Sequence, residues 1–406
     1  MKDYRQLACV LVVTAVGVGL PGARANSASA GTIDDDKKAV VDGNTAFALD
    51  LYAKLRSQDG NLFLSPYSIS TALAMTYAGA RGNTARQMAD VLHFTLEPNR
   101  LHPAFRAMIE SDKAAGSGSA YRLHVANALW GQEGEPFLDE FLNLTKECYG
   151  AGLHQVNFAG ASEEARRTIN QWVEDQTQQM IKDLLSKPDV TPATVLVLVN
   201  AIYFKGQWVS RFDKQLTKDG PFHVSAKEQV MVPTMHQKGE FALASLEDLD
   251  VLELPYVGDK LSMVVILPKK ADGLPGLEQS LNRENLARWL GQLRKRTVQV
   301  AVPRLKLDSK FKLSNVLKTM GMTDAFGSAD FSGMTSGGGL SISEVIHQAQ
   351  VDMNEEGTEA AAATAVVLGR GHEEIPLFTA DHPFLFLIRD RQTGSILFMG
   401  RVVNPK

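Results

Sequence analysis

The chain has 406 residues, of which 44% are hydrophobic and 22% charged, with a formal net charge of −4. This composition is typical of a globular protein and provides enough apolar residues for a large core. The near-neutral balance gives no reason to expect a nucleic acid or an anionic membrane as a partner.

The first residues have the pattern of a secretory signal peptide. Lys2 and Arg5 precede an apolar run over residues 7–20, and Ala23-Arg24-Ala25 offers a cleavage site between small residues. The run is too short for a comfortable transmembrane helix, and a retained anchor is the alternative. The pattern predicts a signal peptide over residues 1–25, and hence a secreted or extracytoplasmic protein, periplasmic in a Gram-negative cell, with no membrane contact after cleavage.

Helical patterns dominate the first half of the chain. Residues 26–42 are small, polar and charged, which predicts a flexible tail before the fold. Phe47, Leu51 and Leu55 then recur four residues apart, as the apolar face of a helix does. The segments that we expect to be helical are 44–55, 68–80, 83–94 (with Asn83 as its cap) and 161–180.

Strand patterns dominate the second half. Residues 194–204, "TVLVLVNAIYF", are apolar without alternation, which is typical of a strand covered on both faces. Asn200 lies inside this run and must find hydrogen-bond partners. The segments that we expect to be strands are 121–130, 194–204, 261–268, 297–307, 384–390 and 395–403. Helices followed by strands predict one α+β domain.

Common catalytic and metal-binding motifs are missing from the sequence. It contains no G-x-S-x-G elbow, Walker A loop, H-E-x-x-H pair or C-x-x-C pair. Ser309 and Lys312 form one S-x-x-K pattern, but its companion motifs are absent, so we interpret it as coincidence. His372 adjoins Glu373 and Glu374 without a second histidine at ligand spacing. We therefore expect no enzyme activity, no metal and no cofactor.

Four segments resemble the serpin family, in the family's order along the chain. Residues 61–84 resemble its early helix with a Ser-Pro-x-Ser element, and residues 199–208 resemble its central strand and the turn after it. Residues 355–364, "EEGTEAAAAT", resemble the hinge of the reactive-centre loop in inhibitory members. Residues 382–405 resemble the carboxy-terminal strand pair.

The resemblance implies an α+β serpin fold with three β-sheets, eight or nine helices and an exposed reactive-centre loop over about residues 355–376. We expect one such domain over residues 43–406. In the implied mechanism a serine protease attacks the loop and forms an acyl-enzyme, and the cut loop then inserts into the main sheet and traps the protease. The expected partner is thus a serine protease in a covalent complex, and the inhibitor itself is expected to be a monomer.

The residues of the hinge fit such an insertion. Because side chains alternate between the faces of a strand, Thr358, Ala360, Ala362, Thr364 and Val366 would share one face, and none carries a charge. The hinge residues that the resemblance assigns are Glu355, Gly357, Thr358, Glu359, Ala360, Ala361, Ala362, Ala363 and Thr364.

Other residues match positions that the family uses to control opening of its main sheet. Ser65, Ser68, Asn200 and His347 match a polar cluster beneath the point where strands part. Trp208 matches a tryptophan at the insertion end, and Glu355 and Arg304 match a salt bridge there. These assignments rest on the resemblance, since ordinary core packing is the alternative for each residue.

The scissile bond has two candidate positions. In the family's commonest register it follows the residue about fourteen places after the hinge glycine, which is Gly371, so that the bond is Gly371–His372. A loop one residue shorter offers Arg370–Gly371, and the cation of Arg370 suits an aspartate-based primary pocket such as that of trypsin. We favour Arg370 and a trypsin-like target, because pockets discriminate strongly between a charged and an absent side chain. Gly371 would indicate an elastase- or subtilisin-like target instead.

Two other functions remain open at this point. A serpin fold without inhibitory activity could act as a carrier, chaperone or storage protein, but many such members carry charged, bulky or proline residues on the inserting face, and residues 358–364 place none there. A hydrolase built on Ser309 and Lys312 would turn over a small ester or amide.

Overall fold

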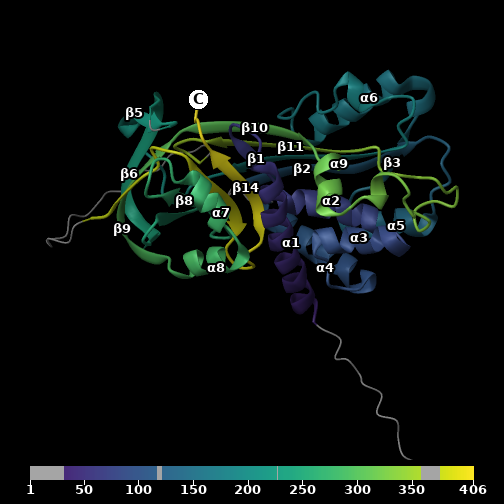
Figure 1. Cartoon of the computed structure of the whole chain (residues 1–406), viewed down its shortest axis with the longest axis horizontal. Coiled ribbons are helices and arrows are strands. Elements are labelled where there is room, and N and C mark those ends of the chain that lie inside the picture. Colours follow the sequence, from purple (N-terminus) through teal and green to yellow (C-terminus); the bar gives the residue numbers. More distant parts are fainter. Residues whose placement is uncertain (1–31, 117–120, 226, 358–374) are drawn as a thin grey trace, which may run out of the picture.

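The structure is a computed structural model that describes residues 32–116, 121–225, 227–357 and 375–406. Long strands run across the molecule, with helices α1 to α5 on one side of them and α6 on the other (Figure 1). The helices are α1 (Ile33–Leu55), α2 (Pro66–Tyr77), α3 (Gly82–Leu92), α4 (Pro98–Gly116), α5 (Asp139–Tyr149), α6 (Phe158–Gln176), α7 (Leu274–Ser280), α8 (Arg283–Gly291) and α9 (Ser314–Met320). Within these described ranges, no helix combines the length and apolarity needed to cross a membrane.

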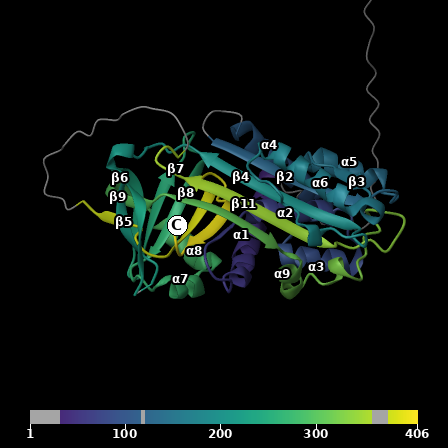
Figure 2. The same cartoon turned by 90° about the horizontal axis from the view of Figure 1, so that it is seen from above.

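A five-stranded sheet has the strand order β10-β11-β4-β2-β3. Its strands are β2 (Tyr121–Gln132), β3 (Leu153–Val156), β4 (Leu196–Gly206), β10 (Leu305–Lys312) and β11 (Glu344–Met353). Seen from above, β2, β4 and β11 lie side by side (Figure 2). In β4, Val197 and Val199 belong to the core under α6, whereas Leu198 and Ile202 belong to the larger core on the other face. This confirms a strand covered on both faces in this segment, with the bounds 196–206 in place of the predicted 194–204.

A second sheet has the order β1-β14-β13-β8-β7-β6-β9-β12, and β5 pairs with β6 beside this path. Its strands are β1 (Leu62–Leu64), β5 (Lys218–His223), β6 (Gln229–Ser245), β7 (Leu249–Pro255), β8 (Leu261–Pro268), β9 (Arg294–Pro303), β12 (Leu377–Thr379), β13 (Phe384–Asp390) and β14 (Ile396–Val402). Hydrogen bonding thus joins two of the three expected sheets, because the 17-residue β6 pairs with β5 at one end and with β7 at the other.

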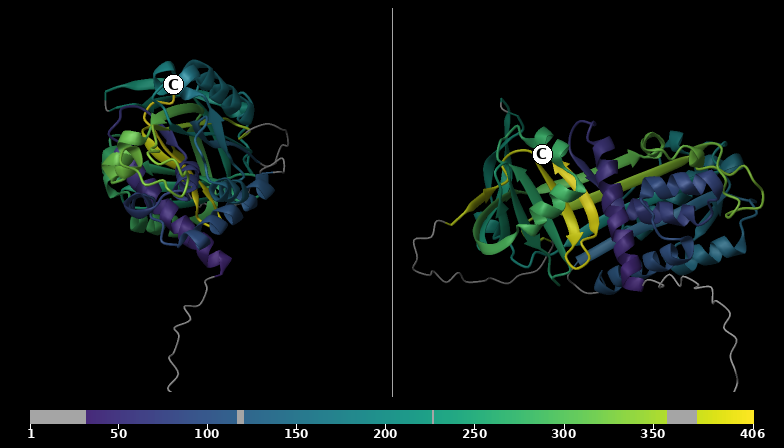
Figure 3. Two further views of the ribbon diagram at one scale, coloured as in Figure 1. Left: turned by 90° about the vertical axis from the view of Figure 1, so that its right-hand side faces the viewer. Right: turned by 60° about the horizontal axis from the view of Figure 1, so that its bottom comes forward.

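The carboxy-terminal strands lie in the middle of the molecule. β13 and β14 pair with one another in antiparallel fashion and are almost entirely buried. Figure 3 shows α1 crossing beside them, and the Asn44 amide of α1 donates a 3.4 Å hydrogen bond to the Ile396 carbonyl of β14. The two ends of the described chain therefore share one core.

The flexible tail predicted for residues 26–42 is wrong over residues 33–42, because α1 begins at Ile33. Thr32 and Asp35 form a capping box, and Asp34, Asp35 and Asp36 place negative charge in the first turn, where the helix dipole favours it. Asp36 is buried and forms an ion pair with Arg100 of α4. The charges that suggested a tail are thus those of a helix start.

Asn83 does not cap α3, in contrast to the prediction. The helix begins one residue earlier, at Gly82, and its cap position is Arg81 without a side-chain hydrogen bond. The Asn83 amide instead donates a 2.5 Å hydrogen bond to the carboxylate of Asp324. This contact, which joins residues far apart in the sequence, takes the place of the local cap.

Candidate functional site at the opening of the five-stranded sheet

Strands β4 and β11 are paired directly with one another in the middle of the five-stranded sheet. They run parallel, from the pair Glu344 and Val197 to the pair Val351 and Phe204. β11 ends at Met353, and the segment that resembles a hinge begins two residues later, at Glu355. A strand inserted between β4 and β11 would have to replace this ladder of hydrogen bonds.

Glu355 is held at the end of β11 by partners from two other segments. Its side chain is buried, and its carboxylate accepts a 2.6 Å hydrogen bond from Nε of Arg304 and another from Oγ1 of Thr217. Burial alone would raise the pKa of Glu355, but the hydrogen bonds from Arg304 and Thr217 outweigh it and hold the pKa below its usual value. The expected pair of Glu355 and Arg304 is therefore present, with an ionised carboxylate.

Gly357 lies against the turn that follows β4. Its φ of +69° lies in the left-handed region, and a Cβ at this position would collide with the amide of Trp208 and the carbonyl of Gly206. The indole N–H of Trp208 donates a 2.9 Å hydrogen bond to the carbonyl of Asn354, and its ring stacks on Tyr256 with centroids 4.5 Å apart. Only glycine fits where the hinge passes this tryptophan.

Ser65, Ser68, Asn200 and His347 form one hydrogen-bonded cluster. Ser65 is the N-cap of α2, and its hydroxyl accepts a hydrogen bond from the amide of Ser68 at 3.2 Å. The amide of Asn200 donates to the Ser68 hydroxyl at 2.6 Å, and Asn200 also bonds to His347. Asn200 and His347 are partners in the β4–β11 ladder, so the cluster ties both strands to α2.

His347 is a neutral side chain with a defined proton position. Its Nε2 accepts a 3.1 Å hydrogen bond from the backbone amide of Ser65, so the ring proton lies on Nδ1 and is donated to Oδ1 of Asn200. Burial lowers the pKa of His347 to about 3, against a smaller opposing effect from Asn200. Protonation would place a buried charge on the ring and remove its acceptor.

Asn127 of β2 belongs to the same cluster and was not identified from the sequence. It is the register partner of Asn200, and its Oδ1 accepts hydrogen bonds from Asn200 and, at 3.2 Å, from the Ser68 hydroxyl. The only available signal was a polar residue between Ala126 and Ala128 in a predicted strand. The register that places it opposite Asn200 depends on pairing between strands far apart in the sequence.

Several predicted site residues lie outside the described residues. These are Thr358, Glu359, Ala360, Ala361, Ala362, Ala363, Thr364, Arg370, Gly371 and His372. Chain segments on both sides of them are described: Gly357 follows β11, and β12 begins at Leu377 beside β9.

The S-x-x-K pattern has no catalytic geometry. Ser309 and Lys312 lie three residues apart on β10, so their side chains point to opposite faces of the strand. Lys312 forms an ion pair with Asp189. Among the residues whose placement is described, no group of three or more histidine, cysteine, aspartate or glutamate side chains could hold a metal ion.

Comparison with known proteins finds similar chains in distant organisms. The human (Homo sapiens) leukocyte elastase inhibitor is 45% identical over 379 residues, covering 89% of this chain and 98% of its own. An uncharacterized serpin-like protein of Thermococcus kodakarensis is 44% identical, covering 92% of this chain and 87% of its own. The crystal structure of uncleaved ovalbumin superimposes with a TM-score of 0.83 and 35% identity, covering 90% of this chain and 100% of that one.

The predicted secretion is contradicted by these relatives. Leukocyte elastase inhibitor is matched over nearly its full length and belongs to a group of intracellular serpins without signal peptides. The prediction rested on residues 1–25, which lie outside the described residues. A basic start followed by an apolar run is a matter of composition alone.

The family model described as "Serpin (serine protease inhibitor)" matches residues 42–405, which is most of the chain. The matched region contains both described sheets, the Glu355–Arg304 pair and the polar cluster beneath β4 and β11. The chain is therefore a member of the serpin family.

Proposed function

We propose that this chain is a suicide-substrate inhibitor of serine endopeptidases. The observation that carries the proposal is the direct pairing of β4 with β11, with the Glu355–Gly357 segment attached at the end of that ladder. A strand that leaves β11 at Gly357 can turn back and enter between the two strands that it borders. The family description and the leukocyte elastase inhibitor relative support inhibition of a protease.

In the proposed reaction the protease supplies the catalytic groups. Its serine Oγ attacks the carbonyl carbon of the residue before the scissile bond, the C–N bond breaks, and the protease's general acid gives a proton to the leaving amine. The inhibitor remains bound as an acyl ester. Insertion of the freed loop then distorts the protease before water can hydrolyse the ester.

The energy for insertion comes from completing the sheet. An added central strand makes on the order of ten hydrogen bonds at about 1 kcal/mol net each, and it buries apolar side chains such as Val366. The face formed by Thr358, Ala360 and Ala362 is small and uncharged, so it can pass between the existing strands. The polar cluster of Asn200 and His347 sets the resistance that insertion must overcome.

We propose Arg370–Gly371 as the reactive bond and a trypsin-like protease as the target. The second candidate, Gly371–His372, has support from the relative named leukocyte elastase inhibitor, since an elastase accepts a small residue.

The test is to mix the protein with trypsin, run a denaturing gel and determine the mass of the released peptide. A covalent band with release of residues 371–406 would support inhibition at Arg370. Release of a peptide that begins at His372, seen with an elastase, would keep the mechanism and change the target. Cleavage by trypsin-, elastase- and subtilisin-like proteases without any covalent band would contradict the proposed function.

Two variants separate the contribution of the charge at this position from that of the fold. Arg370→Ala should lose the covalent band with trypsin, because the primary pocket loses its cation, whereas the matched Arg370→Lys should keep it. Equal bands for all three chains would show that Arg370 does not occupy the primary pocket.

A further inference from the structure

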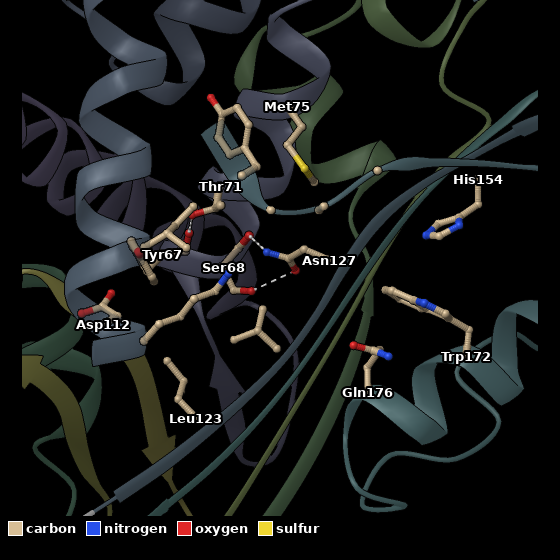
Figure 4. A pocket seen from close by; sticks show the side chains of 17 residues that line it. Tyr67, Ser68, Thr71, Met75, Asp112, Leu123, Asn127, His154, Trp172 and Gln176 are labelled. Carbon is tan, nitrogen blue, oxygen red and sulfur yellow. Dashed lines mark hydrogen bonds between the residues drawn. The ribbon is translucent and has the colours of Figure 1, made fainter. Parts of the chain in front are cut away.

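The face of the five-stranded sheet toward α6 is covered by that helix over only part of its length. Ala126 of β2 and Ala201 of β4 lie at the border of the core under α6, and Figure 1 shows α6 over the end of the sheet near α9 only. The opposite face carries the polar cluster, and Figure 4 shows Asn127 bonded there to Ser68. The uncovered part toward α6 is therefore a separate region of the same sheet.

Two glutamines of β11 converge on one aspartate of β10 in this region. Gln348 and Gln350 lie two residues apart, so their side chains share a face of the strand. Asp308 is the register partner of Gln350. Its carboxylate accepts a 2.7 Å hydrogen bond from Nε2 of Gln348 and a 3.4 Å hydrogen bond from Nε2 of Gln350. Because Asp308 is exposed, the point where the three side chains meet can be reached from solvent.

The amide oxygens of the two glutamines have no partner. Gln348 is 8% and Gln350 7% exposed, and Oε1 of each is buried without a hydrogen bond to any described residue. Buried polar atoms without a partner destabilise a fold, and native proteins contain few of them. Rotation about the last side-chain torsion exchanges the oxygen and the nitrogen of an amide within the same space. That rotation would turn both oxygens toward the Asp308 carboxylate, which becomes favourable when a cation lies between them.

The spacing of these groups is that of neighbouring ligands around a calcium ion. Ca²⁺ takes about six to eight oxygens at about 2.3–2.6 Å, so adjacent ligands lie roughly 2.7–3.6 Å from one another. The two distances from the Asp308 carboxylate to the glutamine amides, 2.7 and 3.4 Å, lie in this range. Ca²⁺ accepts carboxylate and amide oxygens in irregular geometry with water completing the shell, whereas Mg²⁺ demands a near-ideal octahedron. One carboxylate and two amides therefore suit Ca²⁺ better than Mg²⁺.

The charges around Asp308 determine how strongly an ion would bind. Lys306 and Lys310 lie two residues to either side of it, so the three side chains share a face of β10 and the lysines repel a cation. Asp352 lies two residues beyond Gln350 on β11 and adds a negative charge on the same face. With a single carboxylate among the ligands, we expect a dissociation constant on the order of 1 mM, at the weak end of calcium sites.

We propose that Asp308, Gln348 and Gln350 form a calcium site that bridges β10 and β11. Binding turns both amides so that their oxygens coordinate the ion, which gives a partner to each of the two buried acceptors. The ion joins the edge strand β10 to β11 on the side of β11 that faces away from β4. This site lies beyond the proposed inhibition of proteases and does not depend on it.

The first test is thermal unfolding of the full chain at constant ionic strength. Ca²⁺ at about ten times its Kd should raise the melting temperature by about 2 °C, and Mg²⁺ at the same concentration should raise it less. Asp308→Asn should abolish the shift, whereas the matched control Asp272→Asn, at an exposed aspartate in the connection before α7, should keep it. No shift in the wild type, or an equal shift in Asp308→Asn or with Mg²⁺, would overturn the proposal.

Two further variants should strengthen binding, which a merely structural role of these residues would not produce. Gln350→Glu replaces a neutral ligand by a carboxylate and should tighten Ca²⁺ binding about tenfold. Lys310→Gln removes a repelling charge and should tighten it about threefold. Competition with luminescent Tb³⁺ measures both affinities, because Tyr203, the register partner of Gln350 on β4, can transfer excitation energy to a bound ion. Unchanged or weaker Ca²⁺ binding in both variants would refute the assignment of these ligands.

Discussion

At the scale of the residue, Glu355 is the contact on which the hinge depends. It is buried at the end of β11 and accepts hydrogen bonds from Arg304 and Thr217. We expect Glu355→Gln to lower the free energy of the first unfolding transition by about 1.5–3 kcal/mol, the usual contribution of a hydrogen bond to a charged group. Urea denaturation followed by tryptophan fluorescence measures this change.

The control for this prediction is the neighbouring exposed ion pair between Lys214 and Glu356. Lys214→Gln should cost no more than about 0.5 kcal/mol, because surface ion pairs are screened by water. The pKa of Glu355 is lower in the folded than in the unfolded chain, so its contribution is present above the unfolded pKa and lost as the pH falls through the folded pKa. If the free energies of unfolding of wild type and Glu355→Gln still differ in strong acid, the assigned ion pair is contradicted.

His347 also predicts a loss of stability in acid, but here the folded pKa is lowered because burial disfavours the charged ring. Burial lowers its folded pKa to about 3 from an unfolded value near 6.5, so between these values the unfolded chain binds one more proton than the folded chain does. As the pH falls through this window, the wild type should lose about 1.4 kcal/mol of stability per pH unit through His347. The stability gap between wild type and His347→Gln, measured at pH 7, 6 and 5, should therefore narrow in acid. A constant gap would mean that His347 has the same pKa in the folded and the unfolded chain, as an exposed ring would.

At the scale of the element, the start of α1 distinguishes a tail from a helix. Residues 33–42 contain the buried Val40, Val41 and Asp36. A chain that begins at Gly43 should be less stable than one that begins at residue 31 by about 3 kcal/mol or more, since burying one valine contributes roughly 1.5–3 kcal/mol. Thermal unfolding of the two chains, side by side, gives the measurement. Equal melting temperatures would mean that residues 31–42 do not stabilise the fold, as expected of a flexible tail.

The hinge can be tested as an element through the two faces of its expected strand. Ala360 lies on the face that would point into the core after insertion, whereas Ala361 lies on the face that also bears Glu359. Ala360→Glu should convert the inhibitor largely into a substrate, because burying an unpaired carboxylate costs several kcal/mol, while Ala361→Glu should remain inhibitory. The measurement is the number of inhibitor molecules consumed for each protease trapped. Equal effects of the two substitutions would exclude insertion in this register.

At the scale of the whole molecule, local patterns predicted the elements better than their junctions. Residues 261–268 and 384–390 form strands β8 and β13 with the expected bounds, because continuous apolar runs are read directly from the sequence. The place of Asn127 in the polar cluster depended on the β2–β4 register, and the joining of two sheets depended on the length of β6. The secretion prediction rested on composition near the amino terminus, and it is contradicted by relatives that are intracellular serpins without signal peptides. The hinge was recognised through a family resemblance that local propensity could not supply, since its alanines favour a helix.

The closed β4–β11 ladder also makes a prediction for the entire fold. If the intact chain is a state in which the sheet lacks one strand, cleavage between residues 358 and 374 by a protease that is not trapped should stabilise the molecule. About ten added hydrogen bonds at about 1 kcal/mol each would raise the melting temperature by at least about 10 °C. Calorimetry before and after limited cleavage measures the shift, and hydrogen exchange at β4 and β11 should slow in the cleaved form.

The cleaved Ala360→Glu chain is the control for this experiment, because the same bond is broken while insertion is opposed. Its melting temperature should rise much less than that of the cleaved wild type. An unchanged or lower melting temperature for the cleaved wild type would mean that β4 and β11 stay paired after the loop is cut. The closed sheet would then be the stable end state of this chain, and no free energy would remain to distort an attached protease.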